Sequence, residues 1–265
     1  MRIYELKGSG DLDAVKPVAH VYVSGDDDED MAPAVAGLRS ALAEQQRRAK
    51  FIKSLPASEV PDGRRITREL VDRYPEQNLG PIVIVIDEAQ GLFTHPEYKD
   101  VAAELCTKAA KKFRAYGMIL ILLTQTPAPV PAHRRVRPVR HSPVLAVMEW
   151  RANNNVPGTG AHERGLRATD ISVDEQGTGI LARGREGNTV RAAFIKQTEA
   201  EKVGQCVLAM RTAARTLTGE AVGQTVEEVD TETVVDHLQA IWPAGADAVH
   251  SHRLVLALAA HRPNL

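Results

Sequence analysis

A run of five β-branched apolar residues, Ile82 to Ile86, leads directly into two adjacent carboxylates, Asp87 and Glu88. A strand that is apolar at every position, rather than at alternate positions, has both faces covered, as in the parallel sheet of an α/β protein. Open α/β sheets bind ligands at the carboxyl ends of their strands, where these two acids would lie. The pattern therefore predicts a buried parallel strand with an acidic pair at a ligand-binding edge. The alternative is a buried strand whose first loop residues are acidic and solvated.

A second unit of the same kind follows along the chain. After a predicted helix around Ala102 to Tyr116, which Gly117 ends, the apolar run Met118 to Leu123 leads into Thr124 and Gln125. Strand, helix and strand in this order predict a βαβ crossover in a parallel sheet, so that polar side chains of both strands emerge at one edge. P-loop ATPases use an Asp that holds Mg²⁺ through its water shell, a Glu that orients the attacking water and a polar residue near the γ-phosphate.

Other segments extend the alternation of strands and helices. Arg2 to Leu6 predicts a short first strand that is closed by a glycine-rich turn. The acidic run Asp26 to Asp30 predicts a helix start, because apolar residues then recur at helical spacing as far as Ile52 and acids stabilise a helix N-terminus. Basic residues near the end of this helix are interpreted as a complement to its dipole on a solvated face: Arg47, Arg48, Lys50 and Lys53.

The second half of the chain continues with a predicted β-hairpin and a helix. The hairpin is expected at Thr178 to Ala182 and Thr189 to Ile195, around the sequence GREGN, and the helix around Ala200 to Thr216.

Composition narrows the class of protein but not its partner. A chain of 265 residues can bury a sizeable core, and a formal net charge of −1 leaves only a local patch to bind nucleic acid. Two cysteines, Cys106 and Cys206, are too few for a disulfide framework and fit a reducing compartment. No stretch approaches the length needed to span a bilayer. The expectation is a cytoplasmic protein, or the cytoplasmic piece of a larger one.

Four segments, in the same order, resemble the FtsK/SpoIIIE family of ring-forming, DNA-pumping ATPases, in particular the actinobacterial members, which include plasmid-transfer proteins. They are RIYELKGSGDLD, VIVIDEAQGLF, AAELCTKAAKKFRAYGMILILLTQTP and GLRATDISVDEQGTGILARG, and they cover most of residues 1–216. The resemblance implies an α/β fold, a partial P-loop (RecA-like) NTPase domain with a mainly parallel sheet and a small helical tail.

The resemblance also implies the chemistry and the partners. Asp87 and Glu88 match the Walker B pair, with Asp87 holding Mg²⁺ through water and Glu88 catalytic, and Gln125 matches the sensor-like polar residue that contacts nucleotide and assists catalysis. Lys7 and Gly8 match a Lys-Gly turn of the family. ATP and Mg²⁺ are the implied cofactors. The implied partners are double-stranded DNA and further copies in a hexameric ring, with a membrane reached only through a part N-terminal to this sequence.

Two departures from the family pattern change what is expected of the chain. The phosphate-binding loop G-x-x-x-x-G-K-[ST] is missing, and no Gly-Lys dipeptide occurs in the sequence. The chain is therefore expected to be N-terminally truncated, to expose an apolar sheet edge and to be inactive as an ATPase by itself. Thr126 stands where the family usually has an Arg, so no arginine is assigned there.

A third departure is the segment Ala128 to Val144, whose four prolines and four arginines replace an expected loop and core strand. Three interpretations are open: a DNA-binding loop that grips phosphates, a solvated loop, or the product of two compensating frameshifts. The DNA-binding candidates are Arg134, Arg135, Arg137 and Arg140.

The chain is predicted to contain a motor domain over residues 1–216, a linker over 217–229 and a helical segment over 230–265. The last segment is predicted to be two helices with Pro243 to Ala246 between them, the second capped by Ser251. A helical hairpin and the start of a winged-helix module are both compatible with it.

The favoured function is an ATP-driven double-stranded DNA translocase motor, for chromosome segregation in cell division or for conjugative plasmid transfer, present as an incomplete chain. The alternative is a non-catalytic scaffold or DNA-binding fragment of a decayed gene. A third hypothesis is a metal-dependent hydrolase that uses Asp87 and Glu88 without ATP.

Overall fold

The computed structural model describes most of the chain as two compact units, Met1–Thr225 and Val226–Leu265, which are treated separately. The described residues are 1–60, 64–125, 142–145, 160–172, 174–183, 186–226, 234–246 and 248–261. Arg134, Arg135, Arg137 and Arg140, the predicted DNA-binding residues, lie outside them.

The first unit is built on a four-stranded sheet in the order β2-β1-β3-β4, with every neighbouring pair parallel. Its strands are β1 (Arg2–Glu5), β2 (Val21–Ser24), β3 (Ile82–Asp87) and β4 (Met118–Leu122). The predicted α/β class is confirmed, because the two continuous apolar runs form adjacent parallel strands with a helix between them.

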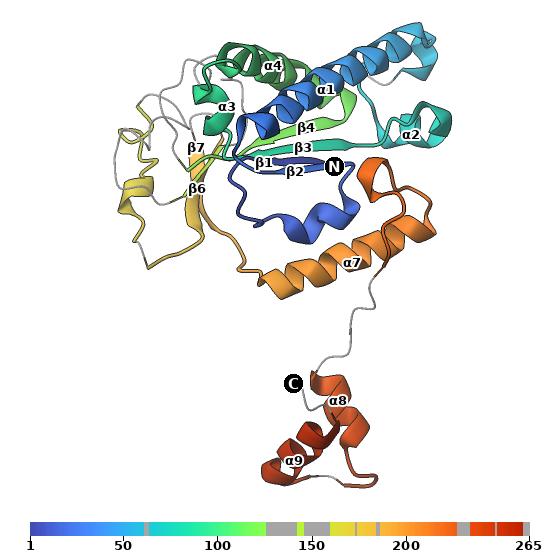
Figure 1. Cartoon of the computed structure of the whole chain (residues 1–265), viewed down its shortest axis with the longest axis vertical. Coiled ribbons are helices and arrows are strands. Elements are labelled where there is room, and N and C mark those ends of the chain that lie inside the picture. The colour runs from blue at the N-terminus through green and yellow to red at the C-terminus, as the bar shows by residue number, and fades with distance from the viewer. Residues whose placement is uncertain are drawn as a thin grey trace. The chain divides into compact units, whose positions relative to one another are not determined.

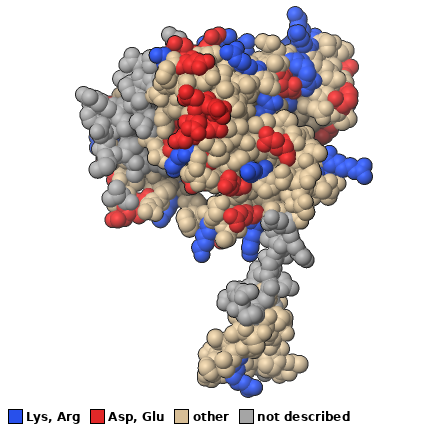
Figure 2. Space-filling model, viewed as in Figure 1, with Lys and Arg blue, Asp and Glu red and all other residues tan. Residues whose placement is uncertain are grey.

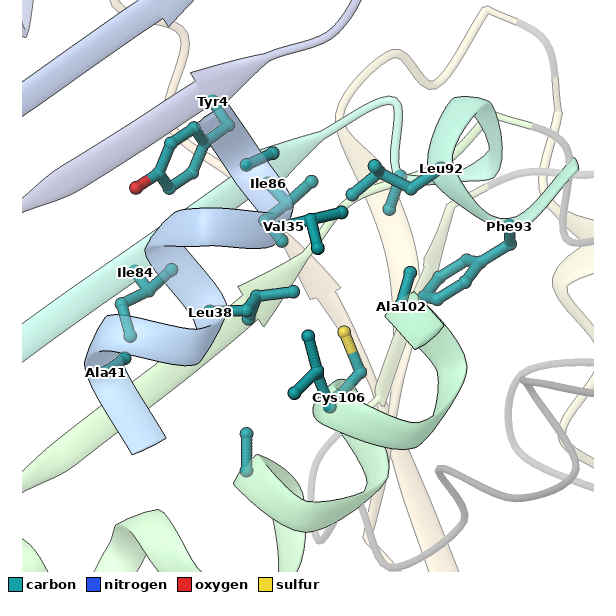
Figure 3. Packing of buried hydrophobic residues seen from close by; sticks show 14 of the residues in the cluster. Tyr4, Val35, Leu38, Ala41, Ile84, Ile86, Leu92, Phe93, Ala102 and Cys106 are labelled. Carbon is teal, nitrogen blue, oxygen red and sulfur yellow. The ribbon is translucent and has the colours of Figure 1, made fainter. Parts of the chain in front are cut away.

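Long helices cover one face of this sheet. Helices α1 (Asp28–Ser54) and α4 (Lys99–Lys112) lie on that face, and α7 (Gln197–Ala213) lies on the other beside η1 (Asp13–Val18), as Figure 1 shows. The core between sheet and helices includes Tyr4, Ile84, Ile86, Leu38 and Cys106 (Figure 3). Burial raises the pKa of the Cys106 thiol to about 12, which keeps it unreactive.

The close contact between α1 and β1 depends on a glycine. A Cβ atom at Gly37 would lie 1.8 Å from the Tyr4 hydroxyl oxygen, so no other residue fits there without a shift. Helix α1 begins as predicted, with acids in its first turn and the Asp30 carboxylate accepting the Asp27 N–H at 3.3 Å. The acidic run is thus part of a helix start.

The other predicted helices are found with shifted ends. Helix α4 starts earlier than predicted and continues as η4 (Phe113–Tyr116), and Gly117 ends it in the left-handed conformation with φ 67°. Helix α7 starts three residues earlier than predicted, where the Glu199 carboxylate accepts the Lys196 N–H at 3.0 Å. The remaining short elements are η2 (Ala57–Glu59), α2 (Arg68–Arg73), η3 (Pro75–Gln77), α3 (Gln90–Thr94), η5 (Ala168–Asp170) and η6 (Gly219–Ala221).

Strand β4 lies at the edge of the described sheet, and one of its faces is uncovered. Ile119, Ile121 and Leu123, which face away from α1 and α4, are 51%, 37% and 40% exposed. These exposed side chains belong to a face of β4, and the apolar sheet edge expected from the sequence stays a prediction.

A second, antiparallel sheet contains β5 (Ser142–Leu145), β6 (Thr178–Arg183) and β7 (Glu186–Arg191) in that order. The hairpin is confirmed, but its second strand starts earlier than predicted, because Glu186 already pairs with Arg183. Strand β5 begins at Ser142, inside the proline-rich segment, so the last residues of that segment form a strand. Pro143 is tolerated because β5 is an edge strand.

The predicted linker 217–229 begins with residues that pack on the first unit. Ala221 in η6 is buried, and the Glu220 carboxylate accepts the Tyr22 N–H at 3.0 Å. Residues 227–229 lie outside the described residues.

The second unit contains α8 (Val234–Ile241) and α9 (Ser251–His261), the two helices expected from the sequence. Among the described residues of both units, no helix combines the length and the apolar character that a membrane crossing requires.

Candidate functional site at the strand ends

Three polar side chains stand in a row where the parallel strands end. The strand register pairs Ser24 with Glu5 and Glu5 with Asp87, so these residues lie side by side on one face of the sheet. Backbone bonds continue past the strands: the Leu6 N–H donates to the Asp87 carbonyl at 3.2 Å and the Ala89 N–H to the Leu123 carbonyl at 2.9 Å. The backbone around Asp87 and Glu88 is therefore held in place by hydrogen bonds on both sides.

Asp87 is half-buried and has few donors. Its Oδ1 accepts the Glu88 N–H at 3.0 Å. Burial raises the pKa of Asp87, and the charges of Glu88 and Glu5 raise it further, against the opposing effects of the Glu88 N–H and Lys7. The carboxylate is therefore short of positive partners.

Glu88 adopts a conformation that is uncommon for its residue type. Its φ is 50°, in the left-handed region, and it is 7% exposed. Its Oε2 accepts hydrogen bonds from the Gln90 side-chain amide and from the Gln125 N–H, the latter at 3.3 Å. Such strain persists where surrounding contacts hold it, and it clusters at functional sites.

The ends of β3 and β4 are joined by a side-chain bridge. The Thr124 hydroxyl donates to the Gln90 side-chain oxygen, and Gln90 in turn donates to Glu88. The structure brings Gln125 to Glu88 through its backbone N–H, while the residue itself is exposed. Gln90 was not singled out from the sequence; its position two residues after Glu88 was the available signal.

Glu5 is a second residue that sequence reasoning missed. It is fully buried, and its carboxylate accepts hydrogen bonds from the Ser9 N–H at 2.8 Å, the Gly10 N–H at 3.1 Å and the Ser9 and Ser24 hydroxyls. Burial by itself raises the pKa of Glu5, but the bonds from Ser24, Ser9 and Gly10 outweigh it, so the pKa lies below its usual value. The available signal was an acid at a predicted strand end followed by a glycine-rich turn.

Glu5 organises the Lys-Gly turn next to Asp87. Gly8 and Gly10 have φ values of 66° and 73°, which favour glycine, and the Lys7 ammonium lies 3.5 Å from the Asp11 carboxylate. The turn that resembles the family therefore packs around a buried carboxylate.

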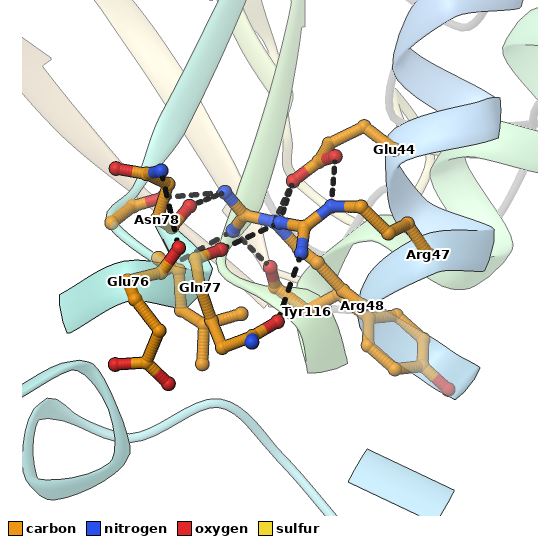
Figure 4. Close-up of polar contacts among 9 residues, drawn as sticks. Glu44, Arg47, Arg48, Glu76, Gln77, Asn78 and Tyr116 are labelled. Atoms are coloured by element: carbon orange, nitrogen blue, oxygen red, sulfur yellow. Dashed lines mark hydrogen bonds and ion pairs between the residues drawn. The ribbon is translucent and has the colours of Figure 1, made fainter. Parts of the chain in front are cut away.

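Of the four basic residues near the end of α1, Arg47, Lys50 and Lys53 are exposed as predicted, but Arg48 is not. Arg48 is 1% exposed, and its guanidinium donates to the carbonyls of Asn78, Leu79, Gly80 and Tyr116 at 2.8–3.1 Å (Figure 4). Arg48 also pairs with Glu44 at 2.7 Å. The prediction was wrong for Arg48, because carbonyls from distant turns surround it.

Surface charge on the visible face offers no single basic patch among the described residues. Figure 2 shows acidic side chains gathered over the start of α1 and basic side chains scattered over the first unit. Arg47 is paired with Glu44 and donates to the Gln77 carbonyl at 2.7 Å.

Comparisons with known proteins support the fold. No family model and no curated protein matches the chain. Among solved structures, the chain is similar to the pCW3 conjugation coupling protein TcpA, solved in its monomer form with ATPγS. The TM-score is 0.60 at 17% identity, over 79% of this chain and 56% of that one. The likeness shows the fold alone: a mixed α/β arrangement of helices around a four-stranded parallel sheet.

A second similar structure is the cytoplasmic domain of the Thermomonospora curvata type VII secretion ATPase EccC. Its TM-score is 0.51 at 17% identity, over 94% of this chain and 27% of that one. The present chain therefore spans only about half of the TcpA chain and about a quarter of the EccC chain.

Proposed function

We propose that this chain belongs to an ATP-driven translocase-type motor and that the carboxyl edge of β3 and β4 is the hydrolytic part of its nucleotide site. The observation that carries the proposal is the meeting of Asp87, Glu88 and the Gln125 N–H at one edge of a parallel sheet. The fold shared with TcpA, a protein solved with ATPγS, supports it.

Each residue has a role in this proposal that its surroundings support. Asp87 suits a cation held through water, because no residue in the described part of the chain donates to its Oδ2 and its charge is not neutralised. A Mg²⁺ ion bound at Asp87 would neutralise part of the negative charge of the phosphates. Glu88, whose carboxylate is held by the Gln90 amide and the Gln125 N–H, orients the attacking water. Gln125 contacts the γ-phosphate.

The finer proposal is a motor of the FtsK/SpoIIIE type that moves double-stranded DNA as a hexameric ring. TcpA is a conjugation coupling protein, which fits a role of this chain in plasmid transfer. Because the net charge is −1, DNA binding must come from a local patch, for which Arg134, Arg135, Arg137 and Arg140 are the candidates.

A second candidate function is a non-catalytic scaffold or DNA-binding fragment. The observation that favours it is the lack of a G-x-x-x-x-G-K-[ST] sequence, since this loop holds the β- and γ-phosphates in P-loop enzymes.

The deciding experiment measures ATP hydrolysis in a form of the protein extended upstream by a phosphate-binding loop. Glu88→Gln should lower hydrolysis by about a hundredfold and leave ATP binding intact, because water positioning is lost while the cation site stays. Asp87→Asn should also weaken Mg²⁺-dependent binding. Glu97→Gln, a change of an exposed acid outside the site, is the control and should have no effect.

The chain of residues 1–265 alone separates the remaining hypotheses. With Mg²⁺, ATP and duplex DNA it should release no phosphate above the level of Asp87→Ala. Clear turnover that Asp87→Ala abolishes would favour the metal-dependent hydrolase. Hydrolysis in the extended form that is unaffected by Glu88→Gln removes the proposed role of that residue.

A further inference from the structure

The Gln90 side chain links the end of β4 to the carboxylate of Glu88. Gln90 is the first residue of α3, and its amide lies between the Glu88 carboxylate and the Thr124 hydroxyl. The backbone holds both ends of this link, because the Ala89 N–H donates to the Leu123 carbonyl at 2.9 Å. The distance that the Gln90 amide spans is therefore set by the pairing of the two strands.

The chemistry of the three groups allows only one orientation of the Gln90 amide. An ionised carboxylate can only accept hydrogen bonds, so the NH2 group of Gln90 must face Glu88. The amide oxygen of Gln90 then faces Thr124, whose hydroxyl is the donor. The link thus has a direction, from Thr124 to Gln90 to Glu88. A methionine at position 90 could neither donate nor accept in the same way.

The two oxygen atoms of the Glu88 carboxylate have different surroundings. Oε2 accepts from the Gln90 amide and from the Gln125 N–H, the latter at 3.3 Å. No donor to Oε1 of Glu88 is found within the described ranges of the chain. Within the same ranges, the one buried side-chain atom without a partner is Oε1 of Gln45, so Oε1 of Glu88 must reach solvent. It is the oxygen that can accept a hydrogen bond from water.

We propose that Gln90 is a positioning residue, which together with Thr124 holds Oε2 of Glu88 and so directs Oε1 toward the attacking water. Thr124 directly precedes Gln125, which is assigned to the γ-phosphate, so a displacement at the end of β4 reaches Glu88 through the Gln90 amide. Hydrolysis therefore depends on the position of the β4 end. The role in hydrolysis rests on the proposed function, but the hydrogen bonds themselves do not.

Proton exchange of the Gln90 amide in the chain of residues 1–265 tests the link without nucleotide. The Gln90 NH2 signals in NMR spectra, identified by their loss in Gln90→Met, should exchange with water about tenfold more slowly than those of the exposed Gln46. Glu88→Ala and Thr124→Val should each speed this exchange, because each removes one partner of the amide. Thr107→Val removes a hydroxyl that bonds within α4, and as the matched control it should have no effect. Exchange as fast as that of Gln46 overturns the proposal.

Steady-state kinetics of the form extended by a phosphate-binding loop test the effect on hydrolysis. Gln90→Met should lower kcat by about tenfold or more and leave KM nearly unchanged, because it removes positioning and not nucleotide binding. Thr124→Val should also lower kcat, whereas Thr124→Ser, which keeps the hydroxyl, should retain it. Gln46→Met is the matched control on α1 and should change neither constant.

The double variant of Gln90→Met and Thr124→Val tests whether Thr124 acts through Gln90. Its kcat should equal that of Gln90→Met alone, because Thr124 then has no amide left to hold. Losses that multiply in the double variant, or a Gln90→Met protein as active as the unchanged one, overturn the proposal while Glu88→Gln is still inactive. Full hydrolysis in Glu88→Gln is a different failure, since it removes the proposed role of Glu88 itself and with it that of Gln90.

Discussion

The two ends of strands β3 and β4 use polar groups in opposite ways. Just before the strands begin, the buried Arg48 guanidinium meets four carbonyl oxygens and the Glu44 carboxylate. At the other end, Asp87 closes β3, accepts a hydrogen bond from the Glu88 N–H and has a raised pKa. One end is saturated with hydrogen bonds, and the other is left short of positive charge. Strained conformations persist only where the surrounding structure holds them, and the hydrogen bonds of the amino end are part of that structure.

Backbone conformation shows the same contrast. Asn78 at the amino end and Glu88 at the carboxyl end both have φ of 50°. Asn tolerates the left-handed region, because its short side chain can bond locally, but Glu does not. Asn78 therefore suits its positive φ at the amino end, whereas Glu88, at the candidate site, does not.

Removing the guanidinium at the amino end should have the largest effect on stability. Arg48→Met leaves several buried carbonyls without donors, so the free energy of unfolding should fall by about 3 kcal/mol or more. Urea unfolding measures it. Arg47→Met is the matched control, since Arg47 shares the Glu44 partner but is more exposed, and it should cost less than about 1 kcal/mol. Equal losses for the two variants would mean that the carbonyl contacts contribute nothing.

The two neighbouring acids at the carboxyl end should respond differently to removal of their charge. Glu5→Ala strips the acceptor from two backbone N–H groups and two hydroxyls, so it should cost about 1–3 kcal/mol in urea unfolding. Asp87→Asn should cost nothing or raise stability slightly, because the carboxylate is unfavourably placed. A loss for Asp87→Asn as large as that for Glu5→Ala would remove the distinction between a structural and a functional acid.

The features that could be predicted from the sequence are those with local signals. Continuous apolar runs identify β3 and β4, helical spacing identifies α1 and α4, and adjacency along the chain identifies the Asp87–Glu88 pair. The shared edge follows from parallel pairing, so the approach of Gln125 to Glu88 could be expected as well.

The features that could not be predicted depend on distant parts of the chain. Arg48 carries a sequence signal typical of a solvated helix end, yet its partners come from the turn before β3 and from Tyr116. Glu5 depends on Ser24 of a neighbouring strand, which only the sheet order brings close. A local pattern predicts elements well, but it does not specify which polar groups meet between them.

Changes at the two left-handed positions should shift stability in opposite directions. Asn78→Ala should lower the free energy of unfolding by about 1 kcal/mol. Asn78 is exposed, so the change loses little packing, but alanine tolerates the positive φ less well than asparagine. Glu88→Gly should raise the free energy of unfolding by up to about 1 kcal/mol, because it relieves the strain of the positive φ. The loss of the hydrogen bonds from Gln90 and Gln125 reduces this gain. Thermal unfolding measures both, with Asn78→Gly as a near-neutral control. Glu88→Ala removes the same bonds without relieving the positive φ, so a Glu88→Gly protein less stable than Glu88→Ala would show that the backbone is not strained.

The smallest effect concerns pH and belongs to the amino end. Burial alone raises the pKa of Glu44, but hydrogen bonds from Arg47 and Arg48 outweigh it, so the pKa is lowered in the folded chain. A lowered folded pKa stabilises the fold above the unfolded value of about 4.3, and this contribution disappears as pH falls through the folded pKa. Glu44→Gln should therefore cost about 1 kcal/mol or less near neutrality and nothing in strong acid.

Urea unfolding of both proteins from about pH 7 down to about pH 3 measures this difference. The two stability curves should converge as the pH falls, because the protonated Glu44 side chain and the glutamine that replaces it are both uncharged. If the curves instead diverged in acid, Glu44 would not be stabilised by the two arginines. The amino end would then owe its stability to the carbonyl contacts of Arg48 alone, which would sharpen the contrast with the acids at the other end of the same strands.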